Sequence, residues 1–166
     1  YQIEEGVTLT QGGIHSGSGL LVKTGNGTLV LTGLNLHSGG MLISEGVLQL
    51  GNDSLLGGPG TGAIENNATL TINRSNTLSG SGILRHIGSG VTLVEGDNSF
   101  TGGTEITNGT LFTGNNNALG TGGISMTGGR LSFNDGINLA NAVVLDGDAE
   151  LSVFESSWVA TLSGNV

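Results

Sequence analysis

A long internal repeat is the feature of this sequence that most restricts its fold. When the chain is shifted by 63 positions, residues 16–57 align with residues 79–120 without a gap. About 18 of the 42 aligned positions are identical, against roughly three or four expected from composition. Glycine supplies ten of these identities, and recurrent glycines predict positive φ or tight corners. The glycines assigned to the repeat are Gly33, Gly39, Gly40, Gly46, Gly57, Gly96, Gly102, Gly103, Gly109 and Gly120.

A shorter period lies inside the long one. A small residue followed by a short alternating burst recurs at residues 6–10, 27–31, 46–50, 68–72, 90–94, 109–113, 129–133 and 149–153. The bursts therefore begin at a nearly regular interval, three to each long repeat, and their alternating Thr, Val, Leu and Ile predict short strands. A second column is predicted at a constant lag equal to one third of the long repeat. Its members are Val22, Ile43, Ile64, Arg85 and Ile106.

Units of this length predict the coils of a parallel β-helix, because two or three short strands cannot close a core until units stack on one another. The expected fold is an all-β solenoid of about eight coils of roughly 19–22 residues, with strands about 4.8 Å apart. A β-propeller is disfavoured because its blades need about 40–50 residues. The interior columns are predicted to contain Leu29, Leu31, Ile43, Leu48, Leu50, Ile64, Leu70, Ile72, Ile106, Leu111, Leu131 and Leu151.

Composition narrows the classes of partner. The formal charge is -9, so binding to nucleic acid or another polyanion is not expected. No apolar run approaches the roughly 18 to 20 residues that span a bilayer. Cysteine is absent, which excludes disulfides and thiol chemistry. Because the chain begins at Tyr1 without Met, residues 1–166 are interpreted as one β-helical segment of a longer protein.

A set of motifs in residues 25–52 occurs again in residues 88–115. In order, these are a Gly-x-Asn at Gly33 and Gly96, a Gly-Gly at Gly39 and Gly102, and a closing Leu-Gly-Asn or its variant. This pattern resembles the passenger-associated transport repeat of bacterial autotransporters. A third repeat is expected to begin near residue 161.

The resemblance implies a right-handed parallel β-helix on the surface of a Gram-negative bacterium. It implies export through an outer-membrane β-barrel translocator in the same precursor, and a stalk or scaffold role that assists folding during secretion. It implies no catalytic site. The alternative is an adhesive or self-associating module that contacts a host or neighbouring cell through its uncharged Thr, Ser and Asn side chains.

Polar motifs give few candidates for chemistry, so no catalytic, cofactor-binding or metal-binding residue is predicted. Asp146, Asp148 and Glu150 are spaced for one strand face but fit an Asp-Gly turn better than a calcium loop. The imidazoles of His15, His37 and His86 have no Ser in a nucleophile elbow to accompany them.

Four further interpretations concern single residues. Asn35 and Asn98 are expected to cap their own corners, since equivalent residues three coils apart lie about 14 Å from each other. Residues 148–163 are assigned as strand and loop in preference to helix, with Trp158 packed in the loop. A carbohydrate-active β-helix is the least favoured alternative. Its candidates, Glu45 and Glu65, are taken to lack an accompanying Arg or Lys.

Overall fold

The computed structural model describes residues 1–51, 62–73, 77–153 and 161–162. Every regular element among them is a β-strand. None of the described residues belongs to a helix long and apolar enough to cross a membrane. In the stretch 148–163, Glu150–Val153 forms a strand, as expected, whereas Trp158 lies outside the described residues.

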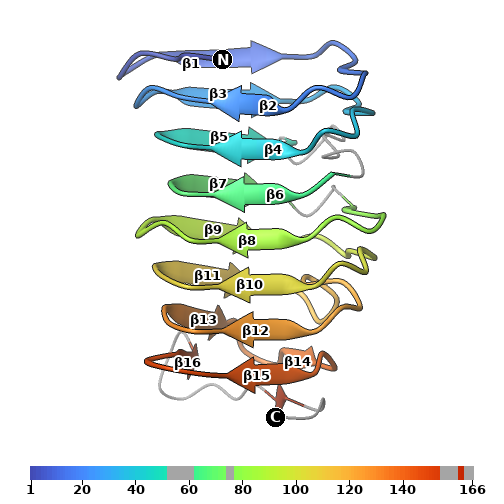
Figure 1. Cartoon of the computed structure of the whole chain (residues 1–166), viewed down its shortest axis with the longest axis vertical. Helices are drawn as coiled ribbons and strands as arrows, with labels where there is room; N and C mark the ends of the chain where they lie inside the picture. The colour runs from blue at the N-terminus through green and yellow to red at the C-terminus, as the bar shows by residue number, and fades with distance from the viewer. Residues whose placement is uncertain (52–61, 74–76, 154–160, 163–166) are drawn as a thin grey trace.

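Two parallel sheets run the length of the molecule and face each other (Figure 1). The first sheet has eight strands: β1 (Thr8–Gln11), β3 (Thr28–Leu31), β5 (Val47–Leu50), β7 (Thr69–Ile72), β9 (Val91–Val94), β11 (Thr110–Thr113), β13 (Arg130–Phe133) and β16 (Glu150–Val153). The second has seven: β2 (Leu21–Lys23), β4 (Met41–Ile43), β6 (Ile64–Asn66), β8 (Leu84–His86), β10 (Thr104–Ile106), β12 (Ile124–Met126) and β15 (Val143–Leu145). A third side is largely irregular and contains the pair β14 (Asn138–Leu139) and β17 (Thr161–Leu162).

The chain descends as a right-handed coil, with the first sheet running rightwards behind and the second leftwards in front (Figure 1). This is the hand that nearly all parallel crossovers adopt. With eight and seven strands in the two sheets, the described chain makes about seven turns, slightly fewer than the eight expected.

Strand register confirms the coil length. In the first sheet the paired column Leu9, Leu29, Leu48, Leu70, Thr92, Leu111, Leu131 and Leu151 advances by the interval that separates the sequence bursts. The first burst was placed one residue early, because Thr8 pairs with Thr28 and Val7 therefore takes the position of Gly27. The other bursts align as the spacing predicted.

The second column was wrong. Val22 pairs with Leu42, which lies beside Glu65 and then Arg85, so these four residues form one outward column. Ile43 instead follows Lys23 in one inward column, and Ile64 follows Met41 in the other. A constant sequence spacing does not follow the strand register here, because the connecting segments differ in length between coils.

The core is continuous from coil to coil. Of the twelve residues assigned to interior columns, all are buried except Leu151, which is partly buried and packs against the others. Met41 and Thr104, which differ between the two repeats, are both buried at the first position of their strands.

The repeat glycines lie at corners and close contacts. Gly57 lies outside the described residues. Positive φ occurs at Gly40, Gly46, Gly103, Gly109 and Gly120. At Gly33, Gly39 and Gly102, a Cβ would collide with the backbone of the neighbouring coil.

Candidate functional site

The second sheet places polar side chains inside the coil at one inward column. Lys23 ends β2 and His86 ends β8, and the two are equivalent in the 63-residue repeat. Asn66 occupies the same column at the end of β6. All three are fully buried. Sequence reasoning did not assign these residues to the interior.

Lys23 uses its ammonium group to hold the turn that follows its strand. The Nζ atom donates to the carbonyls of Thr24 at 3.0 Å, Gly25 at 2.7 Å and Glu45 at 3.2 Å. These acceptors match the three N–H donors of the ammonium group. Burial lowers the pKa of Lys23, and the nearby Glu45 carboxylate opposes that effect. The carboxylate itself accepts from the amide of Gly25 at 2.8 Å, so it fastens the same turn to the next coil.

His86 performs the equivalent task in the second repeat. Its Nε2 lies 3.1 Å from the Gly90 carbonyl, so this nitrogen carries the proton and donates. Its Nδ1 then accepts from the Thr92 hydroxyl at 3.1 Å, and the Asn66 amide nitrogen lies 3.3 Å away. The two hydrogens of that amide are donated to the Thr92 hydroxyl oxygen at 2.8 Å and to the Ala68 carbonyl at 3.2 Å. Lys23, Asn66 and His86 each bond the turn beyond their own strand.

The cluster of Asn66, His86 and Thr92 is a structural network. Every one of its side-chain donors and acceptors has a partner inside the protein, and its three members are completely buried. A substrate could therefore reach the imidazole only if the coil opened. Such satisfied networks favour one arrangement of a core over others.

Acid is expected to weaken the coil through His86. Burial lowers the pKa of His86 below 6.5, although the bond to Gly90 opposes that change. The unfolded chain therefore binds a proton that the folded chain excludes, and stability falls as pH drops from about 6.5 towards the lowered pKa. Because Asn66 holds the same kind of turn without titrating, His86→Asn should reduce this pH dependence. Urea unfolding of both proteins from pH 7.5 to 5 measures the difference. Identical slopes of unfolding free energy against pH in the two proteins would contradict the role assigned to His86.

Charged side chains on the outer face form pairs between adjacent coils. Arg85 contacts Glu105 at 2.7 Å, and Arg130 contacts Glu150 at 2.9 Å. Glu65 lies in register with Arg85, and the Glu45 backbone accepts from Lys23. The expectation that Glu45 and Glu65 lack a basic neighbour was therefore wrong. Exposed pairs of this kind contribute at most about 1 kcal/mol.

The asparagine corners are partly as expected. Asn35 donates to the carbonyl of Gly33 at 3.3 Å, and Asn98 donates to that of Gly96 at 3.2 Å, so both cap their own corners. Asn98 reaches further. It donates to the Ala118 carbonyl at 2.6 Å and accepts from the Leu78 amide at 2.7 Å, which joins three successive coils.

The remaining candidates are not brought together. Asp146 and Asp148 lie in a turn, and Glu150 forms an ion pair with Arg130. His37 is buried at the corner position that Phe100 occupies in the second repeat, and its Nε2 bonds the Gly40 carbonyl at 3.1 Å. His15 contacts the Tyr1 hydroxyl. Among the described residues, no group of three or more His, Asp or Glu side chains is placed to hold a metal.

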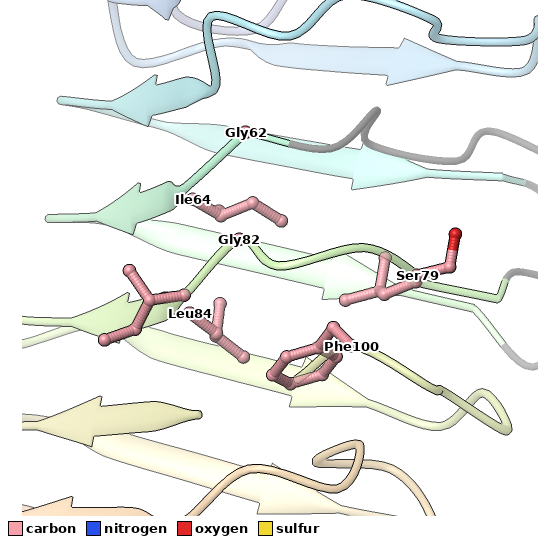
Figure 2. Close-up of a pocket in the computed structure, with 8 residues that line it drawn as sticks. Gly62, Ile64, Ser79, Gly82, Leu84 and Phe100 are labelled. Atoms are coloured by element: carbon pink, nitrogen blue, oxygen red, sulfur yellow. The ribbon is translucent and has the colours of Figure 1, made fainter. Parts of the chain in front are cut away.

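Cavities offer little room for a small molecule. In Figure 2, Ile64, Leu84 and Phe100 extend into a pocket between coils whose volume is about 10 Å³. That space is no larger than a water molecule requires, and its lining is mainly apolar. Two open surface hollows are larger: one of about 280 Å³ beside Glu105 and Ser125, and one of about 220 Å³ beside Tyr1 and His15.

Comparison with known proteins agrees with this architecture. The passenger-associated transport repeat family matches residues 21–50 and 84–111. The chain is also 39% identical over 84 residues to the adhesin BmaC autotransporter of Brucella suis biovar 1 (strain 1330). That alignment covers 47% of this chain and 2% of the relative, so the chain spans a very small part of the relative's length. No solved structure matches the chain. The two transport repeats on a parallel β-helix, together with the similarity to an autotransporter adhesin, support assignment of the chain to an autotransporter passenger and to the bacterial cell surface.

Proposed function

We propose that this segment is a rigid, non-catalytic stalk that supports passenger folding during export and displays other regions away from the cell. Export would use an outer-membrane translocator domain in the same precursor. The observation that carries the proposal is the unbroken stack. Strands of each sheet pair in parallel with the coils on either side, and one apolar core runs through them.

Coil stacking suits a protein that folds as it emerges from a membrane. Each coil contacts mainly its neighbours, so a folded coil presents a template on which the next can be added. The buried side chains of Lys23, Asn66 and His86 bond the turn beyond their own strand and groups of the adjacent coil, so they need no part of the chain beyond the neighbouring coils. The proposal therefore needs no energy source beyond the folding of successive coils.

Surface display of the precursor carrying this segment tests the stalk role. We expect Leu111→Asp, in the buried first-sheet column, to reduce the amount of protease-resistant passenger at the cell surface several-fold. Val144→Asp adds the same charge at an exposed position and serves as the matched control, with display close to wild type. Equal display of both variants would contradict the proposal.

The non-catalytic part of the proposal has a separate test. Glu65, Arg85 and Glu105 lie in register on an outward sheet face, and Arg85 already contacts Glu105. We expect no turnover of acidic or neutral polysaccharides by the chain. Activity that disappears in Glu65→Gln would overturn this expectation.

An adhesive role is the second candidate. It is supported by the exposed aliphatic side chains Ile14, Leu34 and Leu36, because contiguous apolar surface on a soluble protein commonly marks an interaction site. The relative's printed name also describes it as an adhesin.

A further inference from the structure

Two imidazoles that line the hollow beside Tyr1 have nitrogen atoms that bond no other group of the protein. His15 and His37 both line this hollow. His37 is only 4% exposed, and the Nδ1 atoms of both rings are buried. In the part of the chain that the structure describes, four buried side-chain polar atoms have no hydrogen-bond partner, and three of them are these two nitrogens and the Oδ1 atom of Asn35. Buried polar atoms in native proteins nearly always have a partner, so this group of acceptors indicates a ligand.

The fold brings the three side chains to one corner of adjacent coils. His15 and Asn35 are paired in a parallel bridge, so their side chains lie on the same face. His37 follows Asn35 by two residues and is buried as Asn35 is. Gly17 borders this corner, because its carbonyl accepts from the Ser38 amide at 2.9 Å. A Cβ added to Gly17 would meet no atom within 4 Å, so the corner has space for the rings to turn towards a ligand.

The other nitrogen of each ring already has a partner. The Nε2 atom of His37 lies 3.1 Å from the Gly40 carbonyl, so Nε2 carries the proton and Nδ1 keeps its lone pair. The Nε2 atom of His15 lies 2.9 Å from the Tyr1 hydroxyl, and when it donates there its Nδ1 atom also keeps a lone pair. Histidines that bind metal ions almost always donate their other ring N–H to a neighbouring group, which fixes the tautomer and the orientation of the ring. Both rings therefore have the arrangement of metal ligands.

The second repeat builds the same corner without imidazoles. Each of the seven residues that line the hollow corresponds, 63 positions later, to a residue that lines the pocket in Figure 2. His15 is replaced there by Leu78 and His37 by Phe100, and both of these apolar side chains are buried. The Oδ1 atom of Asn98, which corresponds to Asn35, accepts from the Leu78 amide at 2.7 Å. The coil itself therefore does not require the two histidines, and a ligand explains them.

The chemistry of the donor atoms selects the class of ligand. Neutral imidazole nitrogens suit Zn²⁺, Cu²⁺ and Ni²⁺, whereas Ca²⁺ and Mg²⁺ prefer oxygen ligands. We infer that His15 and His37 bind a Zn²⁺ ion through their Nδ1 atoms, with the Oδ1 atom of Asn35 as a third donor and water in the remaining position. The ion would join the first coil to the second. The side chains come together only through the bridge between coils, and for this reason no metal-binding residue was predicted from the sequence.

Calorimetric titration of the 166-residue chain with Zn²⁺, in the absence of any affinity tag, tests this inference. The wild-type chain is expected to bind one Zn²⁺ ion, and Ca²⁺ at the same concentrations is expected to give no binding. The double variant His15→Leu, His37→Phe installs the residues that the second repeat carries at these positions, so the coil can still form. It should lower the affinity for Zn²⁺ at least about tenfold. His86→Asn is the matched control, because it removes the remaining histidine of the chain, and its affinity should equal that of the wild type.

Nuclear magnetic resonance of the imidazole nitrogens in the wild-type chain identifies the ligand atoms without any substitution. Zn²⁺ should shift the Nδ1 resonances of His15 and His37 and leave those of His86 unchanged. A wild-type chain that binds no Zn²⁺ overturns the inference, and so does a double variant that binds as tightly as the wild type. The inference depends on neither the stalk nor the adhesive role. Far-ultraviolet circular dichroism of each variant separates loss of Zn²⁺ binding from loss of the β-helix, on which the stalk proposal depends.

Discussion

Leu48→Asp is expected to lower the free energy of unfolding by at least about 4 kcal/mol, or to prevent folding of the chain. Leu48 is completely buried in the first sheet, between Leu29 and Leu70 of the adjacent coils, which are buried equally. The substitution creates a cavity and places a carboxylate in it with aliphatic neighbours above and below. The loss should appear in urea unfolding as a lower transition midpoint.

The neighbouring residue supplies the control for this experiment. Gln49 follows Leu48 on β5 but points outward and is only partly buried. Gln49→Asp therefore adds the same charge one residue away and gives up one side-chain bond to the Gly51 carbonyl. Its cost should stay within about 1 kcal/mol. If the two substitutions are equally harmful, then position relative to the core is not what determines the effect.

The coil architecture could be predicted because two independent signals in the sequence coincide. Alternating bursts such as residues 27–31 and 46–50 show where strands recur, and the glycines between them show where the chain turns. Each strand pairs in parallel with the equivalent strand of the preceding coil, about one period earlier in the sequence. A regular spacing is therefore enough to indicate stacking, without knowledge of distant contacts.

The second sheet could not be registered from the same signals. Its strands have only three residues, and the segments before them differ in length. A fixed sequence spacing therefore placed Val22, which lies in the outward column, together with Ile43 and Ile64, which lie in the two inward columns. The ion pair of Arg85 and Glu105 depends on that register. Sequence spacing alone placed Arg85 in an apolar column, when in fact it lies outward between two carboxylate residues.

The buried polar residues were missed for a different reason. Lys and His are usually exposed, and residue type alone therefore argues against an interior Lys23 or His86. Their burial depends on carbonyl oxygens of the following turn, which become available only after the coil closes. One signal was present in the sequence. The repeat aligns Lys23 with His86, and both of these side chains can donate a hydrogen bond.

The same turns explain why glycine recurs one coil later. Gly109 lies one coil after the turn that His86 holds and packs against it. Gly46 packs in the same way against the turn that Lys23 holds, and the two glycines are equivalent in the repeat. Gly109 has a φ of +61°, and a Cβ there would lie 2.5 Å from the carbonyl oxygen of Gly90. It would also lie 2.6 Å from the His86 Nε2 atom, which donates to that carbonyl. A methyl group at this position must displace both the turn and the side chain that holds it.

Gly109→Ala is accordingly expected to destabilise the chain by about 3 to 5 kcal/mol, combining backbone strain with overpacking and a weakened His86 bond. Gly136→Ala separates these contributions, because Gly136 has a similar φ of +72° and no atom within 4 Å of the added Cβ. That control should cost only the backbone strain, about 1 to 2 kcal/mol. Urea unfolding of the two variants gives the difference directly. Similar losses of unfolding free energy in the two variants would mean that the turn moves freely to accommodate the methyl group. Gly109 would then recur in the repeat because of its positive φ, and not because one coil stacks closely on the turn that His86 holds.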